Sequence, residues 1–201
     1  MWRSSELNAP SYTKTSWVYL RSVGCIALVA HLSLWFQAMG LFGSKGILPY
    51  VERAERIRTY GIQEQWTSWD YWRAARSILF WNPSDQAIHL CFALGCLAAL
   101  GVILNRFTRP MLVLTWLTYF SISSAGNVFL SFQWDMLLLE MLVMGVLITP
   151  WQKTNEKAAP PVSFLVITAH RFLFFKLMFL SGAVKLLSQD PAWLDLSALH
   201  F

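Results

Sequence analysis

The chain has 201 residues, of which 56% are hydrophobic and 13% are charged, and its formal net charge is +5. Soluble domains carry about 25% charged residues, so this composition excludes an ordinary soluble domain and indicates an integral membrane protein. Nucleic-acid binding is excluded as well, because the cations are scattered among loop ends and apolar runs and form no basic face.

The N-terminal part predicts a polar cytoplasmic tail, residues 1–16, followed by a first membrane span at about 18–41. This run starts too late and is too long for a cleavable signal peptide, so we expect it to be retained. Arg21 near its start can reach the membrane interface with its long side chain. His31 near its middle is expected to be neutral and hydrogen-bonded to a neighbouring helix, with proton relay as the alternative.

The loop after the first span, residues 43–86, is expected to lie along the membrane surface. From Ile47 to Gly61, apolar residues recur at three- and four-residue steps while charged residues fill the opposite side. This pattern predicts an amphipathic helix that is too short and too charged to span.

A second segment of this loop, at 65–80, is rich in Trp. Thr67 followed by Asp70 predicts a capping box at the start of a helix. Because Trp concentrates at membrane interfaces, we interpret the segment as an interfacial anchor, with a partner-binding groove as the alternative.

Four further apolar runs follow, at about 87–104, 111–124, 132–151 and 162–187. Asn82 is expected to cap the first of these helices, with Pro83 in its first turn. The runs predict an all-α integral membrane protein with a transmembrane domain over 17–187, built as a bundle of about five helices plus one or two interfacial helices. Residues 188–201 are expected to begin an extramembrane region.

Loop charges predict the orientation of these spans. The short loops are alternately basic and uncharged, which places the N-terminus in the cytoplasm under the positive-inside rule. The first loop disagrees because it is also basic, but its segments are expected to fold along the interface. The three cysteines, Cys25, Cys91 and Cys96, lie in apolar runs without a Cys-x-x-Cys motif and are interpreted as small buried hydrophobic residues. No metal site and no cofactor are predicted.

The last two runs carry charged residues inside apolar sequence: Asp135, Glu140, Arg171, Lys176 and Lys185. A charge at the centre of a span costs at least about 2.5–3.5 kcal/mol, so these acids and bases are expected to pair. Matching depths predict Asp135 with Lys185, and Glu140 with Lys176 or Arg171. Both a structural and a functional role for this charge network remain open.

Lys185 raises a catalytic alternative. Ser181 and Gly182 precede it by about one turn, which leaves room for either a closely packed helix or a ligand. A buried amine can act as a general base. One lysine without a recognised substrate pocket is weak evidence for catalysis, so no catalytic residue is assigned.

Three ordered blocks of the sequence resemble the lipase maturation factor family. They comprise Tyr19–Arg21 with Gly40–Gly43 and Gly46–Pro49, then Phe129–Asp135 with Leu137–Glu140, and finally Lys176–Leu186 with Asp190–Trp193 and Leu196–Leu199. The family-motif positions within them are Arg21, Gly46, Pro49, Gln133, Trp134, Gly182, Asp190, Pro191 and Trp193. The sequence departs from the expected pattern at Asn127, where glutamine is expected, and at Gln189, where glycine is expected.

The resemblance implies a multi-pass membrane protein that helps dimeric secreted lipases to reach an active, exported state. It implies a membrane of the endoplasmic reticulum in a eukaryote, and the inner or plasma membrane in a bacterium. Membrane lipids are one expected partner. The lipase-like client is expected to bind through a large non-membrane domain that family members carry after the region corresponding to these 201 residues.

A more distant likeness supplies the alternative function. Gly182-x-x-Lys185-Leu186, followed by an Asp and a Trp, is similar to the segment of vitamin K-dependent gamma-carboxylase that holds its catalytic lysine. That likeness implies an intramembrane enzyme with Lys185 as general base on a quinol-like substrate. A small transporter is a third possibility, disfavoured because no pair of interrupted spans marks inverted repeats.

Overall fold

The computed structural model describes residues 12–149, 162–194 and 197–199, which form helices joined by turns with no strand among them. The helices are α1 (Thr13–Leu41), α2 (Tyr50–Gln63), α3 (Ser68–Ala75), η2 (Ile78–Phe80), α4 (Asp85–Ile103), α5 (Thr108–Gly126), η3 (Asn127–Leu130), α6 (Gln133–Ile148), α7 (Phe164–Leu187), α8 (Pro191–Leu194) and η5 (Ser197–Leu199). The chain divides into two compact units, one spanning Tyr12–Pro160 and the other containing Pro161–Phe201.

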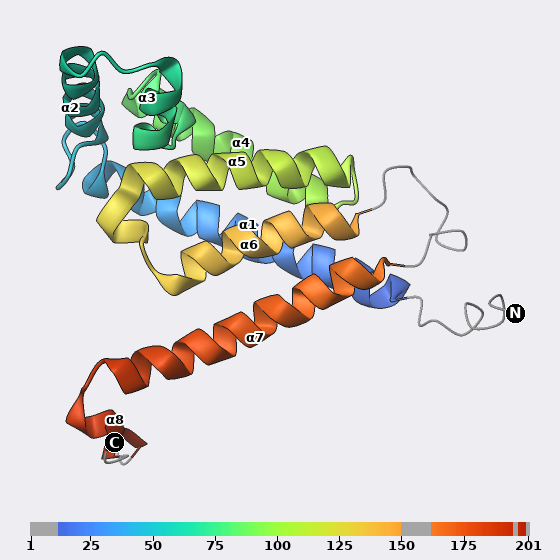
Figure 1. The fold of residues 1–201 in the computed structure, drawn as a ribbon. Coiled ribbons are helices and arrows are strands. Elements are labelled where there is room, and N and C mark those ends of the chain that lie inside the picture. Colours follow the sequence, from blue (N-terminus) through green and yellow to red (C-terminus); the bar gives the residue numbers. More distant parts are fainter. Residues whose placement is uncertain (1–11, 150–161, 195–196, 200–201) are drawn as a thin grey trace, which may run out of the picture. The chain divides into compact units, whose positions relative to one another are not determined.

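The first unit is built on a bundle of α1, α4, α5 and α6 (Figure 1). α1 packs against α4, α5 and α6, and α5 also packs against α4 and α6. Ala27 of α1 and Ala99 of α4 are both fully buried. Small side chains at such positions let two helix backbones approach closely, which is the packing mode expected where no water drives helix association.

Four helices in the described ranges are long and apolar enough to cross a membrane: α1, α4, α5 together with η3, and α7. Large apolar side chains on them remain uncovered, such as Phe36, which is 89% exposed. A bilayer would bury such side chains, while the helices satisfy their own backbone hydrogen bonds. The prediction of an all-α membrane protein is confirmed.

The number of spans depends on α6, which is short. Its 16 residues would extend about 24 Å, less than the roughly 30 Å of a hydrocarbon core. The run expected at 132–151 ends outside the described residues. Five spans, with the N-terminus in the cytoplasm, stay a prediction.

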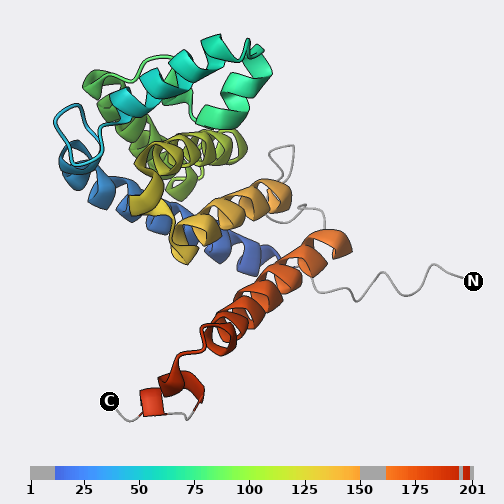
Figure 2. The same ribbon diagram turned by 60° about the vertical axis from the view of Figure 1, so that its left-hand side comes forward.

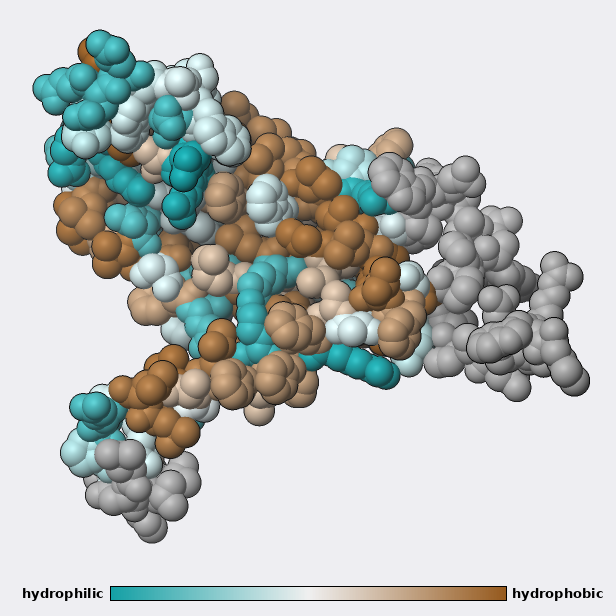
Figure 3. Space-filling model, viewed as in Figure 1, coloured by the Kyte–Doolittle hydropathy of each residue, from teal (hydrophilic) through white to brown (hydrophobic). Residues whose placement is uncertain are grey.

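α2 and α3 lie at the end of the bundle where α1 ends and α4 begins, and they pack against each other (Figures 1 and 2). Figure 3 shows hydrophilic side chains gathered over α2 and α3 and hydrophobic ones over α4 and α5. This distribution is the one that an interfacial cap on a membrane bundle would have.

The expected start of the first amphipathic helix at Ile47 is wrong. Ile47 and Leu48 are 72% and 51% exposed and lie in a turn, and α2 begins at Tyr50 after Pro49. In this turn the Leu48 amide donates to the Leu41 carbonyl at 2.9 Å, so the chain folds back over the end of α1. A Cβ at Gly46 would lie 2.9 Å from the Leu41 carbonyl carbon, which is why the turn needs glycine there.

The capping box of α3 is confirmed. The backbone N–H and the hydroxyl of Thr67 donate to the Asp70 carboxylate at 3.0 and 2.6 Å. These two hydrogen bonds stabilise the charged carboxylate and hold the pKa of Asp70 below its ordinary value.

The cap predicted for the next helix is wrong by two residues. Ser84, not Asn82, caps α4, and its hydroxyl accepts from the Ala87 amide at 3.3 Å. Asp85 begins α4 and accepts from the amide and hydroxyl of Ser44 at 2.8 and 2.6 Å, which ties the turn after α1 to α4.

Two smaller features complete the first unit, and the second corrects an expectation. Residues 127–130, which lie between the runs expected at 111–124 and 132–151, form the short 3-10 helix η3. Of the cysteines, Cys91 and Cys96 are buried as expected, but Cys25 is exposed on α1. An apolar helix in a membrane has no polar face, so its sequence does not show which side turns inward.

Candidate functional site

A row of polar side chains crosses the interior of the first unit, from α1 through α5 to α6. His31, Thr118, Tyr119 and Asp135 are each no more than 4% exposed. Polar groups are costly in an apolar interior unless they are hydrogen-bonded, so their partners define what this row can do.

His31 joins α1 to α5. Its Nδ1 lies 2.8 Å from the Ala27 carbonyl oxygen, and its Nε2 lies 3.2 Å from the Thr118 hydroxyl. Because a carbonyl can only accept, Nδ1 donates to Ala27, while Nε2 meets the Thr118 hydroxyl, which also lies 3.0 Å from the Leu114 and Thr115 carbonyl oxygens. The expected hydrogen bond from His31 to a neighbouring helix is confirmed.

Gly95 of α4 makes this arrangement possible. A Cβ at this position would overlap the His31 ring and would lie 2.9 Å from the Thr118 hydroxyl oxygen. The imidazole therefore fills the space that a side chain of α4 would otherwise take. Three helices meet at this point.

Tyr119 continues the row to α6. Its ring lies 5.2 Å from the His31 ring, centroid to centroid, and its hydroxyl donates to Oδ1 of Asp135 at 2.6 Å. Asp135 lies in the first turn of α6, where the helix dipole favours a negative charge. Its second oxygen, Oδ2, has no hydrogen-bond partner among the described residues.

The predicted charge network divides between the two units. Asp135 is buried and Glu140 is partly buried in the first unit. In the second unit Lys176 is partly buried, and Arg171 and Lys185 are exposed. The pairs predicted between these acids and bases stay predictions.

Lys185 has a partner within its own unit. Its Nζ lies 4.2 Å from the centroid of the Trp193 ring, in the geometry of a cation–π contact. Asp190 positions the tryptophan: its Oδ1 accepts from the Ala192 amide at 3.0 Å, and its carbonyl accepts from the Trp193 amide at 3.0 Å. Pro191 begins α8 directly after this cap, where its missing N–H costs nothing.

Gln189 completes the turn between α7 and α8. Its φ is 53°, in the left-handed region that favours glycine. This explains in physical terms why glycine is expected at this position. At Gly182, by contrast, an added Cβ would meet no atom of the described chain within 4 Å.

The remaining family-motif positions have local roles in the first unit. Arg21 donates from Nη1 to the Val102 carbonyl at 3.1 Å, in the last turn of α4, and stacks on Trp17 at 5.1 Å. The same carbonyl also accepts from the Asn105 amide at 3.2 Å, and a cation at this end of α4 interacts favourably with the helix dipole. Gln133 and Trp134 are exposed at the start of α6, and the Trp134 ring stacks on Phe132 at 4.9 Å.

Sequence reasoning missed Thr118, Tyr119 and Trp193 as partners of the predicted residues. The sequence does carry a signal for the inward-facing side of α5. Three buried residues recur there at three- and four-residue steps: Thr115, Thr118 and Ile122. The Asp-Pro-x-Trp sequence likewise predicts a capped turn that brings the tryptophan back toward the preceding helix.

Comparison with known proteins identifies relatives of the whole described chain. The family model described as "Lipase maturation factor transmembrane domain" matches residues 14–201. Lipase maturation factor 2 of Homo sapiens is 38% identical over 197 residues, which cover 92% of this chain and 27% of the relative. Lipase maturation factor 2 of Xenopus tropicalis is 36% identical over 91% of this chain and 26% of the relative.

A more distant relative, lipase maturation factor 1 of Mus musculus, is 28% identical over 98% of this chain and 35% of the relative. The chain thus spans only about a quarter to a third of the length of the curated relatives that it matches. No solved structure matches the chain.

Proposed function

The chain belongs to the lipase maturation factor family, and on this premise we propose that it is the membrane domain of a factor that assists secreted lipases to mature. The observation that carries the proposal is the match of the family's transmembrane domain to residues 14–201 of a chain with four membrane-length apolar helices. In a eukaryotic cell, the membrane would be that of the endoplasmic reticulum, where secreted proteins fold.

The domain's proposed contribution is to anchor and orient the parts that handle the client. The buried row from His31 to Asp135 supports this role, because its hydrogen bonds fix the relative rotation of α1, α5 and α6. Polar contacts between membrane helices contribute about 0.6–2 kcal/mol each and are directional.

Lys185 is proposed to act as a structural cation rather than as a catalytic base. A cation–π contact with Trp193 stabilises the protonated amine, whereas a general base must be neutral. No observation favours the quinol-dependent carboxylase alternative.

We retain the pairing of Asp135 with Lys185 as part of the proposal. Its support is the open oxygen Oδ2 of Asp135, a buried acceptor that no described donor fills. A buried carboxylate in this state is costly unless a further donor or a proton reaches it. The three N–H groups of an ammonium can donate while its face contacts an aromatic ring.

A domain exchange tests the proposed function. In lipase maturation factor 1 of Mus musculus, the matching membrane segment is replaced by residues 14–201 of this chain and expressed in cells that lack the endogenous factor. Secretion of active dimeric lipase is the expected result, and the same exchange carrying Gly95→Ala serves as a control with a disrupted bundle. A chimera that is membrane-inserted and stable yet secretes no active lipase would contradict the proposal.

A further inference from the structure

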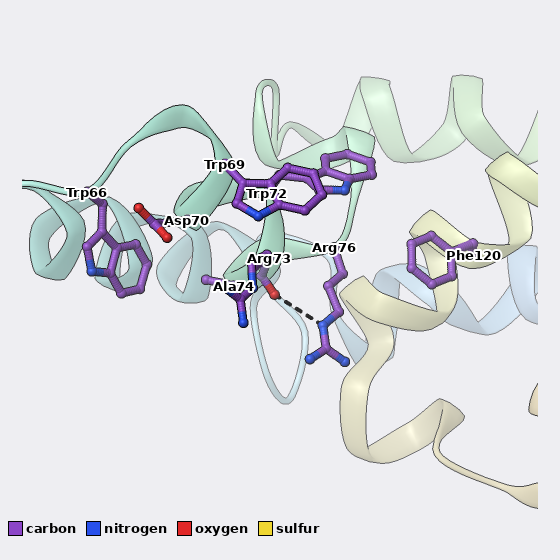
Figure 4. A pocket seen from close by; sticks show the side chains of 8 residues that line it. All are labelled: Trp66, Trp69, Asp70, Trp72, Arg73, Ala74, Arg76 and Phe120. Atoms are coloured by element: carbon purple, nitrogen blue, oxygen red, sulfur yellow. Dashed lines mark hydrogen bonds between the residues drawn. The ribbon is translucent and has the colours of Figure 1, made fainter.

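An open pocket of about 560 Å³ lies beside α3 in the first unit. Its lining includes Trp66, Trp69, Trp72, Arg73 and Arg76 from α3 and its flanking turns, together with Phe120 from α5. Figure 4 shows these aromatic and cationic side chains around one space, with Phe120 contributed by the neighbouring helix. The pocket therefore combines amphipathic rings, two guanidinium groups and an apolar wall.

The two arginines keep donors that the described chain does not use. Nε of Arg76 donates to the Arg73 carbonyl at 3.1 Å, which leaves its two terminal nitrogens without a hydrogen-bond acceptor in the described ranges. The side chain of Arg73 is exposed, and its guanidinium group forms no salt bridge or hydrogen bond to a described residue. Arg73 lies in the last turn of α3 and Arg76 is its C-cap residue, and both line the pocket.

Other arginines of the same loop are already engaged. Arg53 donates to the Ser124 carbonyl and Arg58 to the Phe80 carbonyl, both at 2.6 Å, so these two cations hold α2 against its neighbours. Asp70, the acid in the pocket lining, is bound to Thr67 at 2.6 Å in the capping box. The guanidinium group of Arg73 and the terminal nitrogens of Arg76 are therefore the donors that the pocket offers to a ligand.

The pocket also lies beside a membrane-spanning helix. Directly after Arg76, the Ser77 hydroxyl donates to the Ser121 carbonyl at 2.9 Å, and the Ile78 amide donates to the Ser121 hydroxyl at 3.2 Å. These bonds attach the end of α3 to the last two turns of α5, near the end of a helix long enough to span. Phospholipid headgroups lie at this depth, next to the ends of spans and to interfacial Trp.

From this arrangement we propose that the pocket binds the phosphate-bearing headgroup of an anionic phospholipid. Guanidinium groups match phosphate oxygens in charge and in bidentate geometry. The exposed Trp69, at 64%, and the partly buried Trp66 and Trp72 supply rings suited to the headgroup region. Phe120 and the apolar surface of α5 would receive the acyl chains. The inference concerns the lipid alone and does not depend on the proposed lipase-maturation role.

The test uses the 201-residue chain, purified and stripped of lipid in detergent. Titration calorimetry compares dioctanoyl-phosphatidylglycerol, dioctanoyl-phosphatidylcholine, inorganic phosphate and a poly-glutamate peptide. Each interfacial arginine contributes about a fivefold change in affinity for an anionic lipid. The anionic phosphatidylglycerol should therefore bind at least about fivefold more tightly than the zwitterionic phosphatidylcholine. This comparison needs no variant and therefore does not depend on a mutant that folds.

The variants Arg73→Gln, Arg76→Gln and their double exchange locate the site. The double variant should lose the preference for the anionic lipid, while Arg56→Gln, which removes an equal charge from an exposed position on α2, should keep it. Equal affinity for the two lipids would overturn the proposal. Binding of inorganic phosphate as tightly as the lipid, or binding of the peptide in preference to it, would also overturn it, in favour of a free-phosphate or a protein-docking site.

Discussion

At the residue scale, the hydrogen bond between Tyr119 and Asp135 explains how an acidic side chain is held inside the bundle. The carboxylate is 4% exposed, receives a 2.6 Å hydrogen bond on Oδ1 and lies at the positive end of α6. A hydrogen bond to a charged group contributes about 1.5–3 kcal/mol, more than a typical neutral one. The pair is therefore the strongest specific link between α5 and α6 that we identify.

Replacing Tyr119 with Phe should destabilise the domain by about 1–3 kcal/mol, because it removes the hydrogen bond to Oδ1 of the buried Asp135. Thermal unfolding in detergent measures the change. The effects of Tyr119→Phe and Asp135→Asn should be less than additive in the double variant, since each exchange alone already weakens the same bond. A single Tyr119→Phe variant as stable as the parent would show that the bond contributes nothing.

Gly95 and Gly182 form a matched pair of helix glycines. Gly95→Ala should lower the free energy of unfolding by about 1–3 kcal/mol, the usual cost of overpacking, because the added Cβ overlaps His31. The melting temperature should fall accordingly. Gly182→Ala should be neutral or slightly stabilising, because the new methyl group meets no described atom within 4 Å and alanine favours the helix. Equal effects at the two positions would show that the close approach to His31 is not what requires Gly95.

Some of this site could be predicted from residues alone. His31 stands out as a titratable group in an apolar run, so a hydrogen bond to a neighbouring helix was predictable. Tyr119 was not, because a tyrosine among Trp, Leu and Phe looks like any interfacial ring. Thr115 and Thr118 share a face of α5 with Tyr119 at helical spacing, but that spacing does not choose a neighbour, and only three-dimensional packing selects Tyr119 as the partner of Asp135.

At the element scale, the cap formed by α2 and α3 is held by polar contacts that the sequence indicates to different degrees. The Thr67–Asp70 box was predictable because its residues are three apart and act locally. The start of α2 was not, because it depends on the fold of the preceding turn, in which the Tyr50 amide donates to the Phe42 carbonyl at 3.0 Å. The apolar residues Ile47 and Leu48 of that turn fit the helical periodicity of α2, so the predicted helix began three residues too early.

The first turn of α3 should lose stability at acid pH. The pKa of Asp70 is lowered by its hydrogen bonds to Thr67, so the stabilisation is fully present above the ordinary aspartate value, about 3.9, and is lost as pH falls through the lower folded value. NMR signals of the first-turn amides of α3 should report fraying only below about pH 4. Asp70→Asn should remove this pH dependence, whereas an unchanged transition in that variant would assign it to another group.

At the scale of the whole molecule, the domain combines a polar-linked bundle with a second unit whose long helix α7 carries the cations. On α7 only Leu173 is buried among the described residues, so the rest of its apolar surface is available to lipid or to other helices. The membrane class and the family could be predicted from composition and from three sequence blocks. The pairing between acids and bases could not be settled in the same way, because helical periodicity restricts depth and face but does not choose a neighbour.

The proposed pairing of Asp135 with Lys185 predicts coupling across the molecule. Asp135→Ala and Lys185→Ala should each lower the yield of folded protein, because each leaves an uncompensated charge in the membrane. The double variant should be less impaired than the sum of the two single effects, by a coupling of about 0.5–3 kcal/mol in unfolding free energy. Strictly additive effects would mean that the two residues do not pair.

The measurement that most directly tests the scaffold role is lipase secretion by the domain-exchange protein carrying Lys185→Arg. Arginine keeps the charge and can still stack on Trp193, so a structural cation should survive the exchange. We expect secretion of active lipase within about twofold of the unmodified chimera, a change of less than about 0.5 kcal/mol. Complete loss of active lipase from a chimera that is expressed and membrane-inserted normally would contradict the scaffold role and indicate that the amine of Lys185 takes part in chemistry.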